Sequence, residues 1–525
     1  MKKLFQLTIV SLAFLTLATF SLAQQPESSK SPLVRLLQSK GIITEQEAAM
    51  VSSAATPAQA EQRLADLLLA KGVISRQEYD DTLLALGAGS TPSDESAPRL
   101  VPVVAHVGEP TTVKPAPAKT SAKPGAAQAG SQGEMTTQSK IPVKFYGNIL
   151  LNSTYGSHGS NNIDVPLFAQ KRTAPPPQNH QNFTTTLRAS RFGLRYESKI
   201  FDDAKLTGVF EFDLFGGKPA FANGIDSDIF RLRLAYGRVD WKKDSLEAGQ
   251  DWTVFSPLNP TTLASYGIPG FSTSGNLWNR IPQIRYEHRE GEKSKFIFTT
   301  AVLDPNAGDN SGNPASRTIG IGERGSLPAF EMRLGFTAPS HGKESSGGVS
   351  AHYSRLIGVP GNATVPSDPV GTTVRSPIDS YGISGDANIW LSSGFRVTGE
   401  AFHGRALGIF SGEIAQSSVV IAGRARGITS SGGWVEVHGE APTGYQGAWK
   451  NFSMNGGYGI EDNRDQDLIV GIRKRNQTAM VNGRYNFTSN FATALEYRHV
   501  VTDWFREPQS KQKLDLATLS FLFSF

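Results

Sequence analysis

The chain closes with Lys513-Leu-Asp-Leu-Ala-Thr-Leu-Ser-Phe-Leu-Phe-Ser-Phe525, in which two kinds of side chain alternate. Successive side chains of a β-strand point to opposite faces, so this spacing predicts a strand with one aromatic and one polar face. One face holds Leu519, Phe521, Phe523 and Phe525, and the other holds Thr518, Ser520 and Ser524, with Leu522 as the exception.

The terminal phenylalanine makes this strand similar to the signal by which the barrel-assembly machinery recognises outer-membrane proteins. Phe521, Phe523 and Phe525 are therefore the predicted assembly signal, and this machinery and the outer-membrane bilayer are predicted partners. The last strand of a soluble β-sandwich would show a similar alternation. The predicted signal peptide at the N-terminus favours the outer-membrane interpretation.

Residues 1–23 are predicted to be a secretory signal peptide. Lys2 and Lys3 precede an apolar core over 4–20, and Ser21-Leu22-Ala23 places small residues where signal peptidase requires them. The alternative is a membrane anchor helix, which the absence of a following stop-transfer charge cluster disfavours. Removing both lysines lowers the formal net charge from +5 to +3, which is too small to predict a nucleic-acid partner.

Composition narrows the class of protein further. There is no cysteine, so neither a disulfide framework nor a thiolate metal site is expected. No later run of 18 apolar residues occurs, and the mean hydropathy is −0.27. Such low hydropathy is typical of transmembrane barrels, whose strands alternate lipid-facing and lumen-facing side chains.

Residues 31–87 contain an internal repeat with an offset of 31 positions, and we predict a small helical, periplasmic region. Each repeat has an amphipathic helix that ends at a glycine, Gly41 or Gly72, followed by a capping box. The boxes pair Thr44 with Glu47 and Ser75 with Glu78. This region is either a docking or self-association element or a plain spacer. Residues 88–140, rich in Pro, Ala and Lys, are predicted to be a disordered linker in which contact with the cell wall is possible.

Residues 141–525 predict an all-β transmembrane barrel of about sixteen antiparallel strands. The predicted strands start at Val143, Phe183, Leu206, Ile229, Leu246, Pro282, Phe296, Leu327, Gly348, Tyr381, Phe395, Gly433, Asn451, Gln477, Phe491 and Lys513.

The connections between these strands alternate in length. Short ones, such as 241–244 and 291–294, alternate with long Gly- and Pro-rich ones, such as 157–182 and 255–281. Barrels of the porin type place short turns on the periplasmic side and long loops outside. The alternation therefore predicts the direction of the barrel, with the N-terminal region in the periplasm.

Charged residues occupy the second face of many predicted strands. Charge is costly against lipid, so these residues are expected to line a lumen, which sixteen strands leave open to water. In the fourth strand, for example, Leu232 and Leu234 are assigned to the lipid face. The predicted pore-lining set is Arg191, Arg195, Glu211, Asp213, Arg231, Arg233, Arg285, Glu287, Arg396 and Arg484.

Phe145-Tyr146-Gly147 and Ser190-Arg191-Phe192-Gly193 resemble Gram-negative trimeric porins. The stretches 231–237, 249–252 and 281–286 resemble the DcaP-like porins more specifically. The resemblance, which runs from about Phe145 to Phe525, implies a homotrimeric sixteen-stranded channel in the cell outer membrane. It also implies a helical segment before the barrel and passage of small anionic solutes such as dicarboxylates.

The connection 255–281 corresponds to the loop that trimeric porins fold into the lumen, and its prolines and glycines suit an inward bend; a surface loop would look similar. The arginines predict either a net basic patch that prefers anions or charges that pair with one another across strands.

We expect a water-filled diffusion channel for small hydrophilic solutes. The alternative is a barrel that anchors the envelope through its periplasmic region. No catalytic, cofactor or metal site is predicted, because no G-x-S-x-G elbow occurs and the nine histidines form no spaced metal motif.

Overall fold

We describe the fold from a computed structural model of the chain. It describes residues 34, 37, 40, 42–53, 57–71, 135–136, 142–172, 179–200, 204–218, 228–306, 319–358 and 376–525. Two compact units, Met1–Pro117 and Ala118–Phe525, are treated separately.

The first unit contains helices α3 (Glu45–Ser52) and α4 (Pro57–Ala70). The capping box predicted at Thr44 is present, since Thr44 accepts from Glu47 N and the Glu47 side chain accepts from Thr44 N. The second predicted box lies outside the described residues. No helix in the described part of the chain is long and apolar enough to cross a bilayer. Among the described residues of this unit, one buried apolar cluster consists of Val34, Leu37, Ile43, Ala48, Val51, Leu64 and Leu68.

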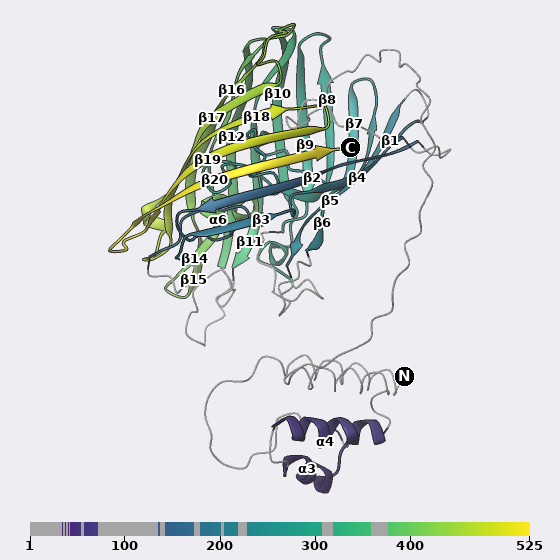
Figure 1. Cartoon of the computed structure of the whole chain (residues 1–525), viewed down its shortest axis with the longest axis vertical. Coiled ribbons are helices and arrows are strands. Elements are labelled where there is room, and N and C mark those ends of the chain that lie inside the picture. The colour runs from purple at the N-terminus through teal and green to yellow at the C-terminus, as the bar shows by residue number, and fades with distance from the viewer. Residues whose placement is uncertain are drawn as a thin grey trace. The chain divides into compact units, whose positions relative to one another are not determined.

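Sixteen antiparallel strands, one of them interrupted, form the second unit (Figure 1). The strands are β2 Val143–Gly156, β3 Asn182–Thr186 with β4 Arg191–Lys199, β5 Lys205–Gly217, β6 Ile229–Asp240, β7 Asp244–Trp252, β8 Arg280–Glu290, β9 Lys295–Leu303, β10 Ala329–Ser340, β11 Lys343–Gly358, β12 Ser376–Ser392, β13 Phe395–Arg405, β16 Thr429–Glu440, β17 Phe452–Asn463, β18 Arg473–Asn486, β19 Phe491–Trp504 and β20 Lys511–Ser524.

Each strand pairs with its neighbour in sequence, and β20 pairs with β2 to close the barrel. Both β3 and β4 pair with β2, so together they form the second strand of the ring. The prediction of sixteen strands is confirmed, and each strand begins within five residues of its predicted start. The other elements in the described part of this unit are β1 Met135–Thr136, η3 Glu323–Gly325, η4 Gly408–Phe410, α6 Gly412–Ala415, β14 Ser418–Ile421, β15 Arg424–Gly427 and η5 Asp465–Asp467.

The outer surface of the barrel is apolar because the strands alternate as predicted. Phe183 and Phe296 are each 69% exposed, and exposed Leu, Ile, Val and aromatic side chains occur on strands all around the ring. A continuous apolar outer face of this kind suits contact with lipid. On β20, Leu519, Phe521 and Phe523 are exposed, while Ser520 is buried.

Two departures from simple alternation have local causes. Leu522 faces inward, where it belongs to a cluster with Leu263 and Tyr266. A register shift in the β5–β6 pair places Leu234 opposite Glu211. Residues directly opposite each other share a face of the sheet, so Leu234 points to the Glu211 side, and its predicted place on the lipid face is wrong.

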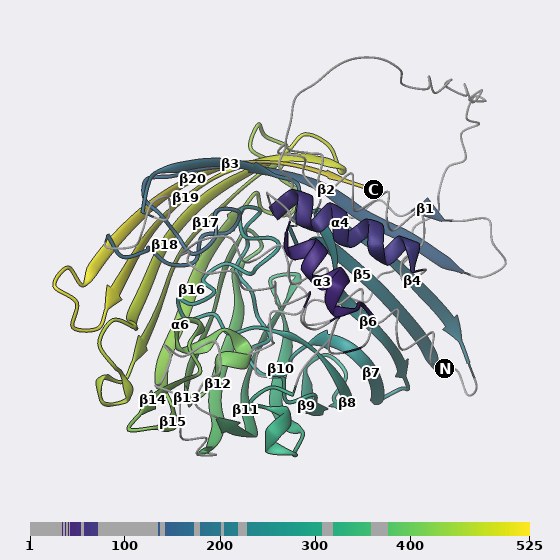
Figure 2. The same ribbon diagram turned by 90° about the horizontal axis from the view of Figure 1, so that it is seen from below.

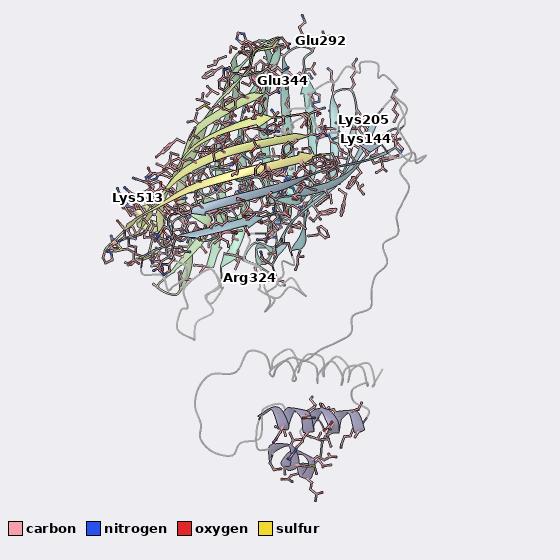
Figure 3. All side chains as sticks on the ribbon, viewed as in Figure 1. Lys144, Lys205, Glu292, Arg324, Glu344 and Lys513 are labelled. Atoms are coloured by element: carbon pink, nitrogen blue, oxygen red, sulfur yellow. The ribbon has the colours of Figure 1, made fainter. Side chains whose placement is uncertain are left out.

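Connections at the two ends of the barrel differ in length. At one end most turns are short, such as 241–243, 341–342 and 393–394, although the connection 441–451 is longer. At the other end, the long connection 253–279 joins β7 to β8. Figure 3 shows Lys144, Lys205, Glu292 and Glu344 toward the short-turn end, and Arg324 and Lys513 toward the other.

The barrel closes where the C-terminal residue meets the first strand. Phe525 N donates to Gly147 O and Gly147 N donates to Phe525 O, both at 3.1 Å. The Phe525 ring stacks on Phe145 with a centroid distance of 5.4 Å. A Cβ atom on residue 147 would lie 2.4 Å from Arg191 O and 2.9 Å from the Phe525 ring, so this position requires glycine.

We expect Gly147→Val to impair barrel closure, because the added side chain has no room at the seam. The matched control is Gly237→Val on β6, where a Cβ would meet nothing within 4 Å. Heat-modifiable electrophoretic mobility reports the folded fraction: Gly147→Val should reduce it strongly and Gly237→Val should not. Equal folded fractions for the two variants would contradict this account of the seam.

The stability of the helical unit is predicted to depend on pH through the Glu47 carboxylate. Its carboxylate lies 2.8 Å from Lys71 Nζ, and this hydrogen bond, together with one from Thr44 N, lowers the pKa of Glu47 to about 2. Because the pKa is lowered, the stabilisation is fully present above the ordinary value of 4.5 and is lost as the pH falls through about 2. Carboxyl NMR titration of the full chain should show Glu47 titrating near 2, and Lys71→Met should raise that pKa. Titration near 4.5 in the unsubstituted protein would exclude the ion pair.

Candidate functional site

The connection 253–279 lies inside the barrel, as its hydrogen bonds to inward side chains on many strands show (Figure 2). Most of its residues are buried, including Phe255, Leu277 and Asn276 at 0% exposure. The predicted boundaries, 255–281, were two residues late, since β7 ends at Trp252 and β8 begins at Arg280. We call this segment the lumen loop.

Buried carboxylates on four strands hold the first part of the lumen loop. Glu331, Glu400, Glu436 and Glu496 come from β10, β13, β16 and β19, and each is at most 5% exposed. Backbone N–H groups donate to the first three: Val254 N (2.7 Å) and Phe255 N (3.0 Å) to Glu331, Leu258 N (2.7 Å) to Glu400, and Thr261 N (2.6 Å) to Glu436; the Thr262 hydroxyl donates to Glu496.

Donors on the facing wall hold the middle of the loop. Arg191 Nη2 donates to Tyr266 O at 2.5 Å, and its guanidinium carbon lies 3.4 Å from the centroid of the Tyr266 ring. Arg231 Nη2 donates to Gly267 O at 2.7 Å, and Asn152 Nδ2 donates to the carbonyl of residue 263 at 3.0 Å. The loop therefore bridges the lumen: the glutamates accept mainly from its first part, and Arg191, Arg231 and Asn152 donate to carbonyls of its middle part.

A second inward segment, 406–416, contacts both ends of the lumen loop. Phe410 packs on Phe255 at a centroid distance of 5.1 Å, and its carbonyl accepts from Trp278 N at 3.1 Å. This segment is itself held by β17, because Ile414 N donates to Glu461 at 3.2 Å. The lumen loop is thus fixed at both ends as well as in the middle.

Arginines gather on the wall formed by β4, β6 and β8, around two carboxylates of β5. Asp213 accepts from Arg231 at 2.6 Å and from Arg233 at 3.1 Å, and Glu211 accepts from Arg233 at 2.7 Å. Pairing across strands, one of the two sequence-based alternatives, is therefore observed for these residues. This pairing involves Arg231 and Arg233, whereas two other arginines of this wall form no ion pair with the described carboxylates.

Arg191 and Arg280 complete this group, which we call the basic cluster: Arg191, Arg231, Arg233 and Arg280 with Glu211 and Asp213. Arg280 interacts electrostatically with the other three arginines and with Asp213. Four guanidinium groups face two carboxylates, so the cluster carries a net charge of +2 when all are ionised. The cluster lies where the middle of the lumen loop meets the wall.

The other predicted pore-lining residues make local pairs outside this cluster. Arg285 lies 3.3 Å from Asp251, and Arg396 lies 3.2 Å from Glu436 and donates to Thr261 Oγ1. The remaining contacts are Arg195 to Glu197 at 2.7 Å, Glu287 to Arg238 at 3.3 Å and to Arg289, and Arg484 Nε to Asn486 at 2.9 Å.

Arg280 and several loop-binding carboxylates were not predicted as site residues. Arg280 fell inside the predicted loop, where no strand alternation assigns it to a face. Glu331, Glu436 and Glu461 each stand on the inward face of a strand, and this recurrence was the signal available in the sequence. Within the described ranges no group of three or more His, Asp or Glu side chains is arranged to hold a metal ion.

We expect Glu436→Ala to loosen the lumen loop, because it leaves Thr261 N without its acceptor and Arg396 without its carboxylate. Loss of a buried acceptor of this kind costs about 1–3 kcal/mol. Single-channel conductance should rise, and proteases should cut within 253–279 more readily. Glu292→Ala, in an exposed short turn, is the matched control. Conductance equal to that of the unsubstituted protein would show that this carboxylate does not hold the loop.

Comparison with solved structures identifies a fold neighbour. The chain resembles the outer membrane channel DcaP of Acinetobacter baumannii with a TM-score of 0.55 and 16% identity, over 74% of this chain and 99% of that one. Similarities with TM-scores below 0.5 include an anion-selective porin from Comamonas acidovorans (0.44, 12% identity, 74% and 100% covered) and Salmonella typhi OmpF in complex with daunomycin (0.45, 11% identity, 75% and 100% covered). No protein-family model and no curated protein matches the chain. At this identity the likeness to DcaP concerns the fold, and it agrees with the sixteen-stranded barrel.

Proposed function

We propose that this protein is an outer-membrane porin, a water-filled diffusion channel for small hydrophilic solutes that prefers small anions such as dicarboxylates. The observation that carries the proposal is the basic cluster with its net charge of +2 beside the lumen loop.

The barrel supports a channel rather than a solid structural element. A ring of sixteen strands is wide enough to leave an aqueous lumen, whereas eight strands fill their own interior. Its inner face carries charged residues such as Arg195, with a side chain 34% exposed, and Arg231, 25% exposed. The fold neighbour DcaP is described as an outer membrane channel.

The division of charge between the walls supports the preference for anions. Glu331, Glu400 and Glu436 are buried and accept hydrogen bonds from the lumen loop, so they are poorly placed to attract a passing cation. On the facing wall, two guanidinium groups lack a compensating carboxylate. Fixed positive charge at a narrow point of a pore favours anions.

The remaining expectations belong to the same proposal. We place the helical region and the short turns in the periplasm and the long connections outside, with residues 1–23 removed on export. We also propose that the chain belongs to the DcaP-like porins, forms a homotrimer and is recognised by the barrel-assembly machinery through Phe521, Phe523 and Phe525.

The reversal potential of the purified full chain in a planar bilayer tests the selectivity. Under a KCl gradient, its sign should show chloride passing more readily than potassium. Arg191→Gln should reduce this preference, because it removes one of the uncompensated charges. Lys205→Gln, at the exposed short-turn rim, is the control and should leave the preference unchanged. Clear cation selectivity of the unsubstituted protein would refute the proposal.

A tethering role is the second candidate, because the helical unit has its own buried core. In that role the barrel would anchor the envelope to the cell wall and need not conduct. Liposome swelling separates the two candidates: a chain that lets small sugars and carboxylates enter supports the channel, and an impermeable chain supports the anchor.

A further inference from the structure

Arg280 occupies an unusual position among the lumen arginines. It is the first residue of β8, directly after the lumen loop, and its guanidinium carbon lies 4.8 Å from the Trp252 ring centroid and 5.2 Å from that of Trp278. Stacking on indole rings uses the flat faces of a guanidinium group, while its N–H donors point outward in the plane. The rings therefore orient Arg280 without satisfying its donors.

No carboxylate in the described part of the chain makes an ion pair with Arg280, whereas Arg231, Arg233 and Arg285 each have one. Arg191, Arg231 and Arg233 repel Arg280, while Asp213 and Glu211 attract it without forming an ion pair with it. Arg280 is half-buried, and its Nη1 atom is fully buried. A cation that is withdrawn from water in this way normally has a counter-charge close by, because desolvation is costly. Among the residues that the structure describes, Arg280 therefore has no ion-pair partner.

Unsatisfied donors occur on Arg280, on Trp278, which it contacts, and on Arg191, with which it interacts electrostatically. Arg280 Nη1, Trp278 Nε1 and Arg191 Nε are all buried and have no hydrogen-bond acceptor. Arg191 and Arg280 belong to the basic cluster, and Trp278 contacts Arg280 through its ring. Native proteins leave few buried donors unpaired, and a group of them is commonly completed by water or a bound ion. Unpaired buried polar atoms also occur elsewhere in the barrel, so it is the positive excess of the basic cluster that favours an anion as the partner of these donors.

We infer that Arg280 and Trp278, with Arg191 beside them, form a binding site for an oxyanion, a carboxylate or a phosphate, within the pore. This inference rests on the proposed function and deepens it. A guanidinium edge binds two oxygens of a carboxylate or phosphate side by side, and the indole N–H supplies a further donor. Chloride can neutralise the charge but cannot make this bidentate contact.

A binding site changes how the channel conducts. In a pore without a site, current rises in proportion to the solute concentration. In a pore with a site, passage requires binding and release, so the current carried by the bound anion saturates. Saturation by oxyanions is therefore the property that distinguishes this protein from a simple diffusion pore.

The experiment measures the conductance of the full chain in planar bilayers at increasing concentrations of potassium acetate, potassium phosphate and potassium chloride. Saturation should appear at the lowest concentration with acetate or phosphate, and the comparison of these two salts identifies the preferred oxyanion. Arg280→Gln should raise the half-saturating concentration by about tenfold or more, because a charge-assisted hydrogen bond is lost. The half-saturating concentration of Arg280→Lys should fall between those of the unsubstituted protein and Arg280→Gln, since lysine keeps the charge without the planar pair of donors.

Two further variants separate binding from general damage. Lys205→Gln is the control, because that lysine pairs with Glu197 at the exposed short-turn rim, and saturation should be unchanged. Trp278→Phe keeps an aromatic ring and removes the N–H, so it should weaken saturation while the reversal potential in KCl stays the same. Electrophoretic mobility confirms that each variant is folded, and Trp278→Phe decides the question if Arg280→Gln does not fold.

The results distinguish this inference from the proposed function. Conductance that rises linearly with acetate and phosphate, or equal effects of Arg280→Gln and Lys205→Gln, would overturn the oxyanion site even if the channel were anion-selective. A chain that does not conduct, or that prefers cations, would overturn the proposed function itself.

Discussion

The hydrogen bonds between the lumen loop and the inward carboxylates are the interaction on which the interior of this barrel depends. The described lumen loop forms no β-ladder with a strand, yet most of its residues are buried. Its backbone N–H groups therefore need acceptors from side chains, since an unpaired buried donor is costly. Glu331, Glu400 and Glu436 provide them from three different strands.

This arrangement also separates charge across the lumen. The carboxylates of β10, β13 and β16 are engaged by the loop, and the loop carbonyls near Tyr266 and Gly267 meet the arginines of the facing wall. Structural need and selectivity are linked in this way, because the groups that fix the loop determine which charges remain uncompensated. The wall formed by β4, β6 and β8 therefore carries the excess positive charge.

The barrel could be predicted well from the sequence because the same alternation of apolar and polar residues recurs in strand after strand. Period-two alternation located all sixteen strands, and the face bearing Phe521 and Phe523 was identified correctly. Two residues depart from the alternation because of contacts or pairing inside the barrel. Leu522 packs against the lumen loop, and Leu234 follows a register shift that propensity and alternation do not encode.

The site was less predictable for a different physical reason. The arginines and carboxylates were recognised as inward-facing, but their partners lie on other strands or on the lumen loop. Asp213 engages Arg231 and Arg233 of the neighbouring strand, and Arg191 reaches Tyr266 seventy-five positions away. Arg280 could not be assigned to a face at all, because its orientation is set by Trp252 and Trp278 rather than by strand alternation.

The most direct test of the account is a crosslink between the lumen loop and the barrel wall. The chain has no cysteine, and Ser256 of the loop lies with its Oγ 3.0 Å from Ser384 Oγ of β12. We predict that the double substitution Ser256→Cys, Ser384→Cys forms an intramolecular disulfide in the folded protein, detected by altered mobility that reductant reverses. The control pair, Ser256→Cys with Ser392→Cys at the far end of β12, should remain reduced. If the first pair also stays as two reactive thiols under oxidising conditions, the loop does not lie in the lumen and the account is wrong.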